Sequence, residues 1–169
     1  MNQHIASVGQ PSLLWPSLGW RHARLPELSP LELARIYRAR QEVFSIEQDC
    51  AYLDADEADE QSYHLAAWSP EHALPLAYAR LVDPGVKYDE PSMGRVITTA
   101  AARGTGLGRE LVRRVLGLSA QLHPGLGVRI SAQSRLRRFY GEFGFDAVGE
   151  DYLEDGIPHI EMVLRRSEA

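Results

Sequence analysis

Cysteine is nearly absent from this chain of 169 residues, in which Cys50 is the only one. A single cysteine excludes an internal disulfide and fits a reducing compartment, so we expect a cytoplasmic location. No apolar run approaches the roughly 18 residues that a membrane-spanning helix needs, which excludes a membrane span. The first 17 residues lack a basic stretch followed by an apolar block, so we expect no secretory signal.

Metal-binding patterns are also missing. No spacing of cysteine and histidine resembles a zinc site. The acidic run Asp54–Glu60 mimics part of a calcium loop, but its sixth position holds Asp59 instead of glycine, and the twelfth position holds Leu65 instead of glutamate. We therefore expect no metal and interpret the run as a solvated loop. An amine-attracting rim of an acceptor site is the second interpretation.

Charge is unevenly distributed along the chain. The formal net charge is −5, but Arg103–Arg138 contains eight arginines against the single acid Glu110. This segment carries +7, so the other residues carry −12. The acidic remainder would repel phosphate backbones, and the arginines lack interleaved exposed aromatic residues, so we expect no nucleic-acid partner. The question is which other anion the basic segment serves.

Hydrophobic periodicity predicts alternating strands and helices in one domain at residues 19–166, after a loosely ordered leader at residues 1–18. A helix begins at Pro30 behind the capping box of Ser29 and Glu32 and runs to about Phe44. Two more helices carry apolar faces that begin at Leu107 and Leu136. Strands are expected at Trp20–Leu25, Tyr63–Trp68, Leu76–Val82, Arg95–Thr98, Val128–Ser131, Ala147–Asp151 and Ile160–Leu164. The order of elements predicts an α/β or α+β fold with a mixed sheet.

A glycine-rich turn, Arg103–Gly108, lies between the strand that ends at Thr98 and the second helix. Such a turn suits an anion, because free N–H groups at the start of a helix point at the ligand. The dinucleotide fingerprint fails because Arg109 stands where its third glycine would be, and the Walker pattern is missing as well. A tight turn without a ligand is the alternative.

The remaining pattern, Arg103-x-x-Gly106-x-Gly108, resembles the acetyl-CoA loop of the GNAT acetyltransferase superfamily. The stretch Phe139–Phe145 matches that family's Tyr-x-x-x-Gly-Phe motif. Val43–Tyr52 and Glu154–Ile160 are similar to the ElaA-type branch of the family, and matching positions run from about Trp20 to Leu164. Gln133 stands where many GNAT proteins have asparagine, although this branch commonly has glutamine there.

The resemblance implies the GNAT fold, a central mixed, mostly antiparallel sheet of six to seven strands flanked by about four helices. It also implies acetyl-CoA as cosubstrate and a primary amine, on a small molecule or a peptide, as acceptor. The residues to which it assigns cofactor binding are Val96, Ile97, Thr98, Arg103, Gly104, Thr105, Gly106, Leu107, Gly108, Arg109, Gln133 and Phe139.

The resemblance also assigns the role of general acid to Tyr140, because a phenol can give a proton to a departing thiolate. Tyr140 belongs to an apolar helical stripe as well, so a core position is the alternative. Candidates for the general base or the acceptor site are Glu47, His64 and His159, with Glu154 a further one, and ordered water could replace them. A GNAT module that binds CoA without catalysis is the alternative function. Nothing in the sequence decides between a monomer and a homodimer.

Overall fold

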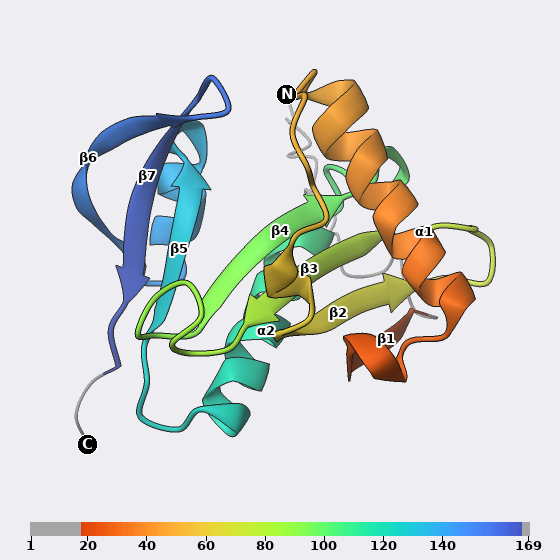
Figure 1. Cartoon of the computed structure of the whole chain (residues 1–169), viewed down its shortest axis with the longest axis horizontal. Helices are drawn as coiled ribbons and strands as arrows, with labels where there is room; N and C mark the ends of the chain where they lie inside the picture. Colours follow the sequence, from red (N-terminus) through yellow and green to blue (C-terminus); the bar gives the residue numbers. More distant parts are fainter. Residues whose placement is uncertain (1–17, 167–169) are drawn as a thin grey trace, which may run out of the picture.

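The computed structural model describes residues 18–166, so residues 1–17 of the predicted leader lie outside the described part. Seven strands form one open sheet in the order β1-β2-β3-β4-β5-β7-β6 (Figure 1). They are β1 (Gly19–Arg24), β2 (Ser62–Trp68), β3 (Ala77–Val82), β4 (Ser92–Thr98), β5 (Val128–Gln133), β6 (Asp146–Glu154) and β7 (Ile157–Leu164). Strands β4 and β5 are parallel, and the other neighbours pair antiparallel. The predicted mixed, mostly antiparallel sheet is confirmed.

Three α-helices occur in residues 18–166, one fewer than expected: α1 (Pro30–Gln41), α2 (Leu107–Leu122) and α3 (Arg137–Gly141). The predicted capping box is present at α1, where the Ser29 hydroxyl accepts from the Glu32 N–H at 3.2 Å and Glu32 accepts from the Ser29 N–H at 2.8 Å. A π-helical turn, Glu42–Glu47, continues α1. No helix in the described range is long and apolar enough to cross a membrane.

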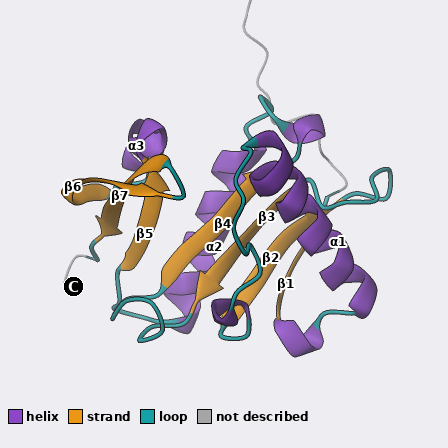
Figure 2. Ribbon diagram, turned by 45° about the horizontal axis from the view of Figure 1, so that its top comes forward, coloured by secondary structure: helices purple, strands orange, loops and turns teal. Residues whose placement is uncertain are grey.

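Helices cover both faces of the sheet (Figure 2). Helix α1 lies on one face, and its contacts form a small core of Ile36, Ala39, Val43, Ala66, Tyr78 and Ile97. Helix α2 lies on the other face, where Leu111 and Val115 are fully buried against strands β2 to β5. Successive strand residues point to opposite faces, so Leu65 faces α2 and Ala66 faces α1.

Strands β4 and β5 meet at one point and then diverge (Figure 2). Ser92 and Arg129 are the only register pair between them in the described part of the chain. Farther along, the register between β3 and β4 shifts at Tyr78 and Arg80, and Arg95 has a φ of 53°. Such a bulge bends a strand and re-aims its side chains. The edge of β4 that faces β5 is therefore left without a partner strand.

The acidic run Asp54–Glu60 is only in part the solvated loop that its composition predicts, because Asp56, Glu57 and Glu60 are exposed but the other two acids are buried. Asp54 is 7% exposed and Asp59 is 1% exposed. Arg40, wholly buried in α1, binds Asp54 at 2.7 Å and Asp59 at 2.8 Å. Arg80 of β3 also binds Asp59 at 2.8 Å. The opposite charges come from distant elements, which is why the local sequence gives no sign of them. Residues 18–166 contain no group of three or more His, Cys, Asp or Glu side chains arranged to hold a metal ion.

Candidate active site

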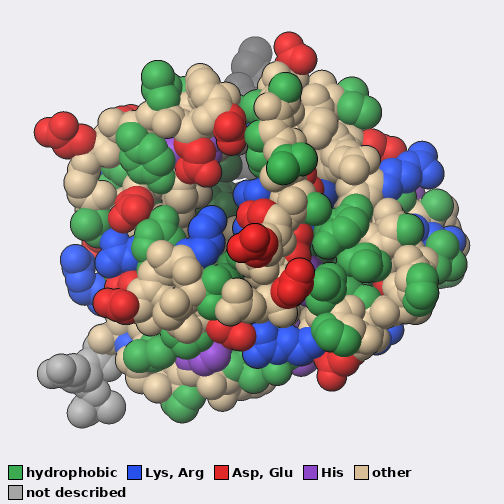
Figure 3. Space-filling view, in the orientation of Figure 1, with side chains coloured by type: hydrophobic (Ala, Val, Ile, Leu, Met, Phe, Trp, Pro, Cys, Tyr) green, Lys and Arg blue, Asp and Glu red, His purple; other side chains and the backbone are tan. Residues whose placement is uncertain are grey.

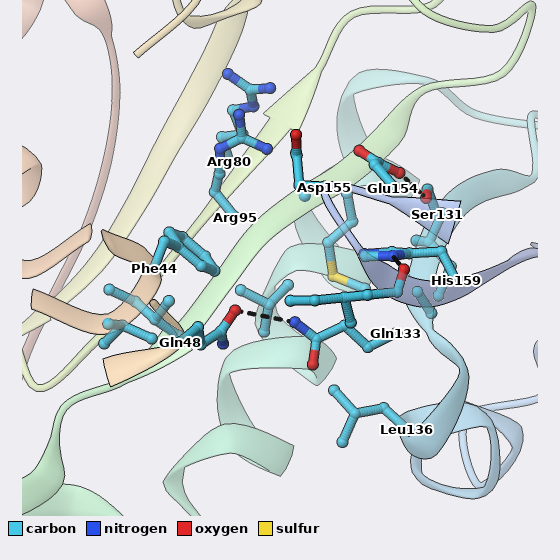
Figure 4. Close-up of a pocket in the computed structure, with 18 of the residues that line it drawn as sticks. Phe44, Gln48, Arg80, Arg95, Ser131, Gln133, Leu136, Glu154, Asp155 and His159 are labelled. Carbon is cyan, nitrogen blue, oxygen red and sulfur yellow. Dashed lines mark hydrogen bonds between the residues drawn. The ribbon is translucent and has the colours of Figure 1, made fainter. Parts of the chain in front are cut away.

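A cavity of about 630 Å³ occupies the space between the diverging strands. Its walls come from β4, from β5, from the segment after α1 and from the hairpin that joins β6 to β7. Figure 3 shows a hollow on this face of the molecule, with acidic and basic side chains around it. The close-up in Figure 4 shows Arg80 and Arg95 on one side of the pocket and Glu154 and His159 on the other.

The glycine-rich turn leads into α2 just beyond the end of β4. Gly104 and Gly106 have φ values of 75° and 85°, the left-handed region that favours glycine. Gly106 is the N-cap of α2, and the N–H groups of Gly106, Leu107 and Gly108 have no backbone acceptor in the described residues. These groups mark the positive end of the helix dipole, which suits a phosphate.

The predicted cofactor residues fall into two sets. Val96, Ile97, Thr98, Arg103 and Gln133 line the cavity. The others lie around the start of α2 and on α3 without lining it: Gly104, Thr105, Gly106, Leu107, Gly108, Arg109 and Phe139. A Cβ atom added to Gly108 would lie 3.6 Å from the Thr98 side chain, so the turn sits directly against the end of β4. The turn thus lies next to the part of the cavity that Thr98 lines.

Two arginines of the turn are held by acids. Arg103 reaches back to β4, where its Nε donates to the Thr98 carbonyl at 3.1 Å, and its Nη2 lies 2.5 Å from the Glu47 carboxylate. Arg109 binds Glu142 at 2.9 Å. All four of these charged side chains are well exposed, so solvent screens the pairs and an incoming phosphate can compete for the arginines.

Tyr140 is both a core residue and a cavity residue. It is 6% exposed, lines the cavity from α3 and contacts the ring of Phe139 at a centroid distance of 5.1 Å. Burial raises the pKa of its phenol, so the hydroxyl stays protonated at neutral pH. No described residue makes a hydrogen bond with that hydroxyl. A protonated, unengaged donor in the cavity can serve as a general acid.

The candidates for the general base differ in whether they reach the cavity. Glu47 and His159 line the cavity, whereas His64 does not. His64 is 1% exposed, with Nδ1 at 2.7 Å from the Tyr78 hydroxyl and Nε2 at 2.9 Å from the Asp59 carbonyl. Burial lowers the pKa of His64. The structure therefore removes His64 from the candidates, because both ring nitrogens are occupied in the interior.

The wall formed by β5 and the β6–β7 hairpin carries a hydrogen-bonded acid. Ser131 donates to Glu154 at 2.9 Å and also contacts the Tyr152 hydroxyl. His159 Nδ1 lies 2.8 Å from the Ile157 carbonyl, which can only accept, so Nδ1 carries the proton. In the neutral ring Nε2 is then the basic nitrogen. Glu154 and His159 both line the cavity and are the strongest base candidates.

Sequence reasoning missed the basic side of the cavity, which Arg80, Lys87 and Arg95 line. It also missed the hydrogen bond across the pocket from Gln133 to Gln48, at 3.1 Å (Figure 4). Two signals were present in the sequence. Arg80 interrupts a strand that is otherwise apolar, and Lys87 is the only lysine in the chain.

Comparison with known proteins decides the family. Residues 36–166 match a family model described as an acetyltransferase (GNAT) domain. The chain belongs to the GNAT acetyltransferase family. A UPF0039 protein of Synechocystis is 45% identical to this GNAT chain over 148 residues, which cover 88% of the chain and 96% of that protein. Protein ElaA of Escherichia coli is 35% identical over 145 residues, with coverages of 85% and 94%.

Solved structures agree with this assignment. A Pseudomonas aeruginosa structure described as an acyl-CoA N-acyltransferase superposes with a TM-score of 0.83 at 41% identity, covering 89% of this GNAT chain and 100% of that one. The crystal structure of E. coli ElaA gives a TM-score of 0.81 at 34% identity, with the same coverages. The predicted fold and the resemblance to the ElaA-type branch are both confirmed.

The GNAT fold indicates acyl-CoA binding, and the residues present fit that ligand. The unpaired edge of β4 offers backbone N–H and C=O groups to a chain that carries amides, as an added strand would use them. The N–H groups at the start of α2 and the exposed Arg103 and Arg109 offer donors to phosphates. The two features are adjacent, in the order that a phosphate-terminated pantetheine arm requires.

Proposed function

We propose that this protein transfers an acetyl group from acetyl-CoA to a primary amine by direct attack. One observation carries the proposal. One cavity is lined by Val96–Thr98 of β4, by Tyr140, and by Glu154 and His159, and the turn with the free N–H groups of α2 lies against the end of β4. This arrangement supports a phosphate site at the turn and a general acid and a base in the cavity, the groups that acyl transfer uses.

On the cofactor side, the diphosphate would lie at the N–H groups of Gly106, Leu107 and Gly108, near Arg103 and Arg109. The pantetheine amides would pair with the open edge of β4 at Val96–Thr98. Backbone donors on this edge would also polarise the thioester carbonyl, which stabilises the oxyanion that forms during attack. In this arrangement the Gln48–Gln133 hydrogen bond crosses the path of the arm and has to open when the arm enters.

The chemistry conserves atoms and charge. The neutral amine attacks the thioester carbon, a C–N bond forms, and the tetrahedral intermediate then loses the sulfur as the C–S bond breaks. Glu154 or His159 takes the proton that the amine loses, directly or through water. The Tyr140 hydroxyl donates a proton to the departing thiolate. The products are an N-acetyl amide and free CoA.

Release of CoA thiol from acetyl-CoA across a library of primary amines tests the proposal. Tyr140→Phe should lower kcat by about 10²–10⁴, the usual contribution of a positioned acid, while calorimetry finds the affinity for acetyl-CoA unchanged. Tyr63→Phe is the control, because Tyr63 lies outside the cavity, beneath the Arg24 guanidinium. Thiol release should be the same in this control as in the unmodified protein.

Two results would contradict the proposal in different ways. If acetyl-CoA binds but no amine in the library releases thiol, the protein is a CoA-binding module. If acetyl-CoA does not bind, the whole assignment of the cleft is wrong. We also propose a cytoplasmic location, on the ground that the chain's single cysteine, Cys50, is free and buried.

A further inference from the structure

We propose that the amine acceptor carries an anionic group, as an amino acid does, and that Lys87 and Arg95 bind this group. The inference rests on the proposed acetyl transfer, because donor and acceptor would share one cavity. It differs from the second interpretation of the acidic run Asp54–Glu60, as a rim that attracts an amine. Three features of the cavity walls support it.

The first feature is that the three aspartates of the acidic run are already paired with arginines. Asp54, Asp56 and Asp59 face Arg40, Arg80 and Arg95 across six ion pairs, three charges of each sign. Arg40 and Arg80 are 0% and 1% exposed, so bulk water screens their pairs little. This side of the cavity therefore presents no surplus of negative charge to an approaching ammonium group.

The second feature is a surplus of positive charge beside these pairs. Lys87 lines the cavity, and no carboxylate of residues 18–166 lies within 4 Å of its ammonium. Desolvation and the nearby Arg80 and Arg95 lower the pKa of Lys87, while the more weakly acting carboxylates of Asp56 and Glu154 raise it. A bound anion would offset the repulsion from the two arginines. Arg95 adds donors, since only its Nε and Nη2 bind Asp54 and Asp56.

The third feature is the opposite polarity of the facing wall. Glu154 and Asp155 line the cavity from the β6–β7 hairpin, and neither forms an ion pair with a cation of the described residues. Asp155 and Gly156 both have positive φ, 50° and 78°, as in the tight turns that close hairpins. This turn places Asp155 on the cavity wall across from Arg95 (Figure 4). An ammonium group can lie at these acids while an anion lies at Lys87.

An acceptor with charges of both signs fits these walls better than the alternatives. A diamine would bring a second positive charge toward Lys87 and Arg95. An uncharged alkyl amine would offer no opposite charge to Lys87 or to the free Nη1 of Arg95. A carboxylate and a phosphonate share the required chemistry, so both belong in the test.

The test uses amines of the form H2N–CH2–CH2–X that differ only in the end group X: β-alanine, propylamine and 1,3-diaminopropane, with 2-aminoethylphosphonate as the second anion. Glycine and ethylamine form a shorter matched pair. We expect kcat/KM for the better anionic amine to exceed that of its neutral match about tenfold or more, as a charge-assisted hydrogen bond would give. The more active of β-alanine and the phosphonate identifies the anion.

Variants assign the preference to the lysine. Lys87→Met should reduce the ratio of kcat/KM for the anionic amine to kcat/KM for the neutral amine about tenfold. Lys87→Glu should turn the preference toward 1,3-diaminopropane. Lys87→Arg should keep the anionic preference. Arg38→Met is the matched control, because Arg38 is exposed on α1, outside the cavity, and its loss should leave the ratio unchanged.

The possible failures are distinguishable. If neutral or cationic amines are the better substrates of the unmodified protein, the inference is wrong while the proposed acetyl transfer stands. The same holds if Lys87→Met leaves the ratio as it was. If no amine of any charge releases thiol from acetyl-CoA, the proposed function itself fails. Calorimetric affinity for acetyl-CoA shows in each variant whether the cleft is still folded.

Discussion

Replacement of Arg40 by methionine tests the buried charge network most directly. Methionine keeps most of the aliphatic stem but removes a guanidinium that makes three short contacts: Nε to the Asp54 carboxylate at 2.7 Å, Nη1 to Asp59 at 2.8 Å and Nη2 to the Asp54 carbonyl at 2.7 Å. Removal of one partner from a buried ion pair costs about 3–5 kcal/mol, because a buried charge is left uncompensated.

The low end of this range applies, since neither carboxylate becomes wholly unpaired. Asp59 keeps Arg80 at 2.8 Å, and Asp54 keeps Arg95 at 2.9 Å. We therefore expect Arg40→Met to lower the free energy of unfolding by about 3 kcal/mol. For a chain of this size that is a fall in Tm of about 6–12 °C. Arg38→Met is the control, because the exposed pair of Arg38 and Glu42 contributes about 0.5 kcal/mol or less.

Urea unfolding followed by circular dichroism gives both values, provided that the m-value is unchanged. Addition of Asp54→Asn to Arg40→Met should recover part of the loss, because it removes one of the two carboxylates that lose a partner. A loss below about 1 kcal/mol would refute the reasoning. A double variant no more stable than the single one would show that the guanidinium acts through packing instead of charge.

Four further predictions concern pH and glycine. Burial acts to raise the pKa of Asp59, but hydrogen bonds from the two arginines outweigh it, and the net shift is downward. The ion pairs of Asp59 therefore stabilise the fold fully above the pKa that Asp59 has in the unfolded chain. This stabilisation is lost as pH falls through the lower pKa of Asp59 in the folded protein, which urea titrations between about pH 7 and pH 2 should show. Gly106 has a φ of 85°, so Gly106→Ala should raise the Kd for acetyl-CoA at least threefold, as measured by calorimetry. Gly117 lies on α2 with open space around it, so Gly117→Ala should stabilise the protein by about 0.5–1 kcal/mol, as measured by urea unfolding. Gly127→Ala would place a Cβ 2.4 Å from the Leu164 carbonyl oxygen and should lower the free energy of unfolding by about 2 kcal/mol; an unchanged urea midpoint would contradict this clash.

Local signals in the sequence predicted most of the fold. The capping box at Ser29, the apolar runs of β2 and β3, and the glycines before α2 each act over a few residues, and each appears in the structure at the expected place. Helix α3 is shorter than its apolar spacing suggests, because a 3₁₀ turn at Ser134–Leu136 takes up its first residues. Apolar spacing reports which face is buried but does not tell a 3₁₀ turn from an α-helix.

The candidate site was less accessible to sequence reasoning, because its geometry depends on strands that separate. Nothing local marks the point at which β5 leaves β4, since this divergence follows from the packing of whole elements. His64 had the chemistry of a base, but its burial depends on Tyr78 and Asp59, which belong to other elements. The sequence predicted a solvated position for Asp54, because its partner Arg40 lies 14 residues away on a helix. Pairing over such distances is set by tertiary structure.

The scarcity of lysine has a practical consequence for chemical labelling. Lysine ε-amines react with acyl donors, whereas arginine guanidinium groups stay protonated and do not. This chain has one lysine among its 18 basic residues, and that lysine lines the cleft. Any acyl mark found on an ε-amine of this protein therefore lies on Lys87. Protection of that single ε-amine by a bound compound could be followed on the one peptide that contains it.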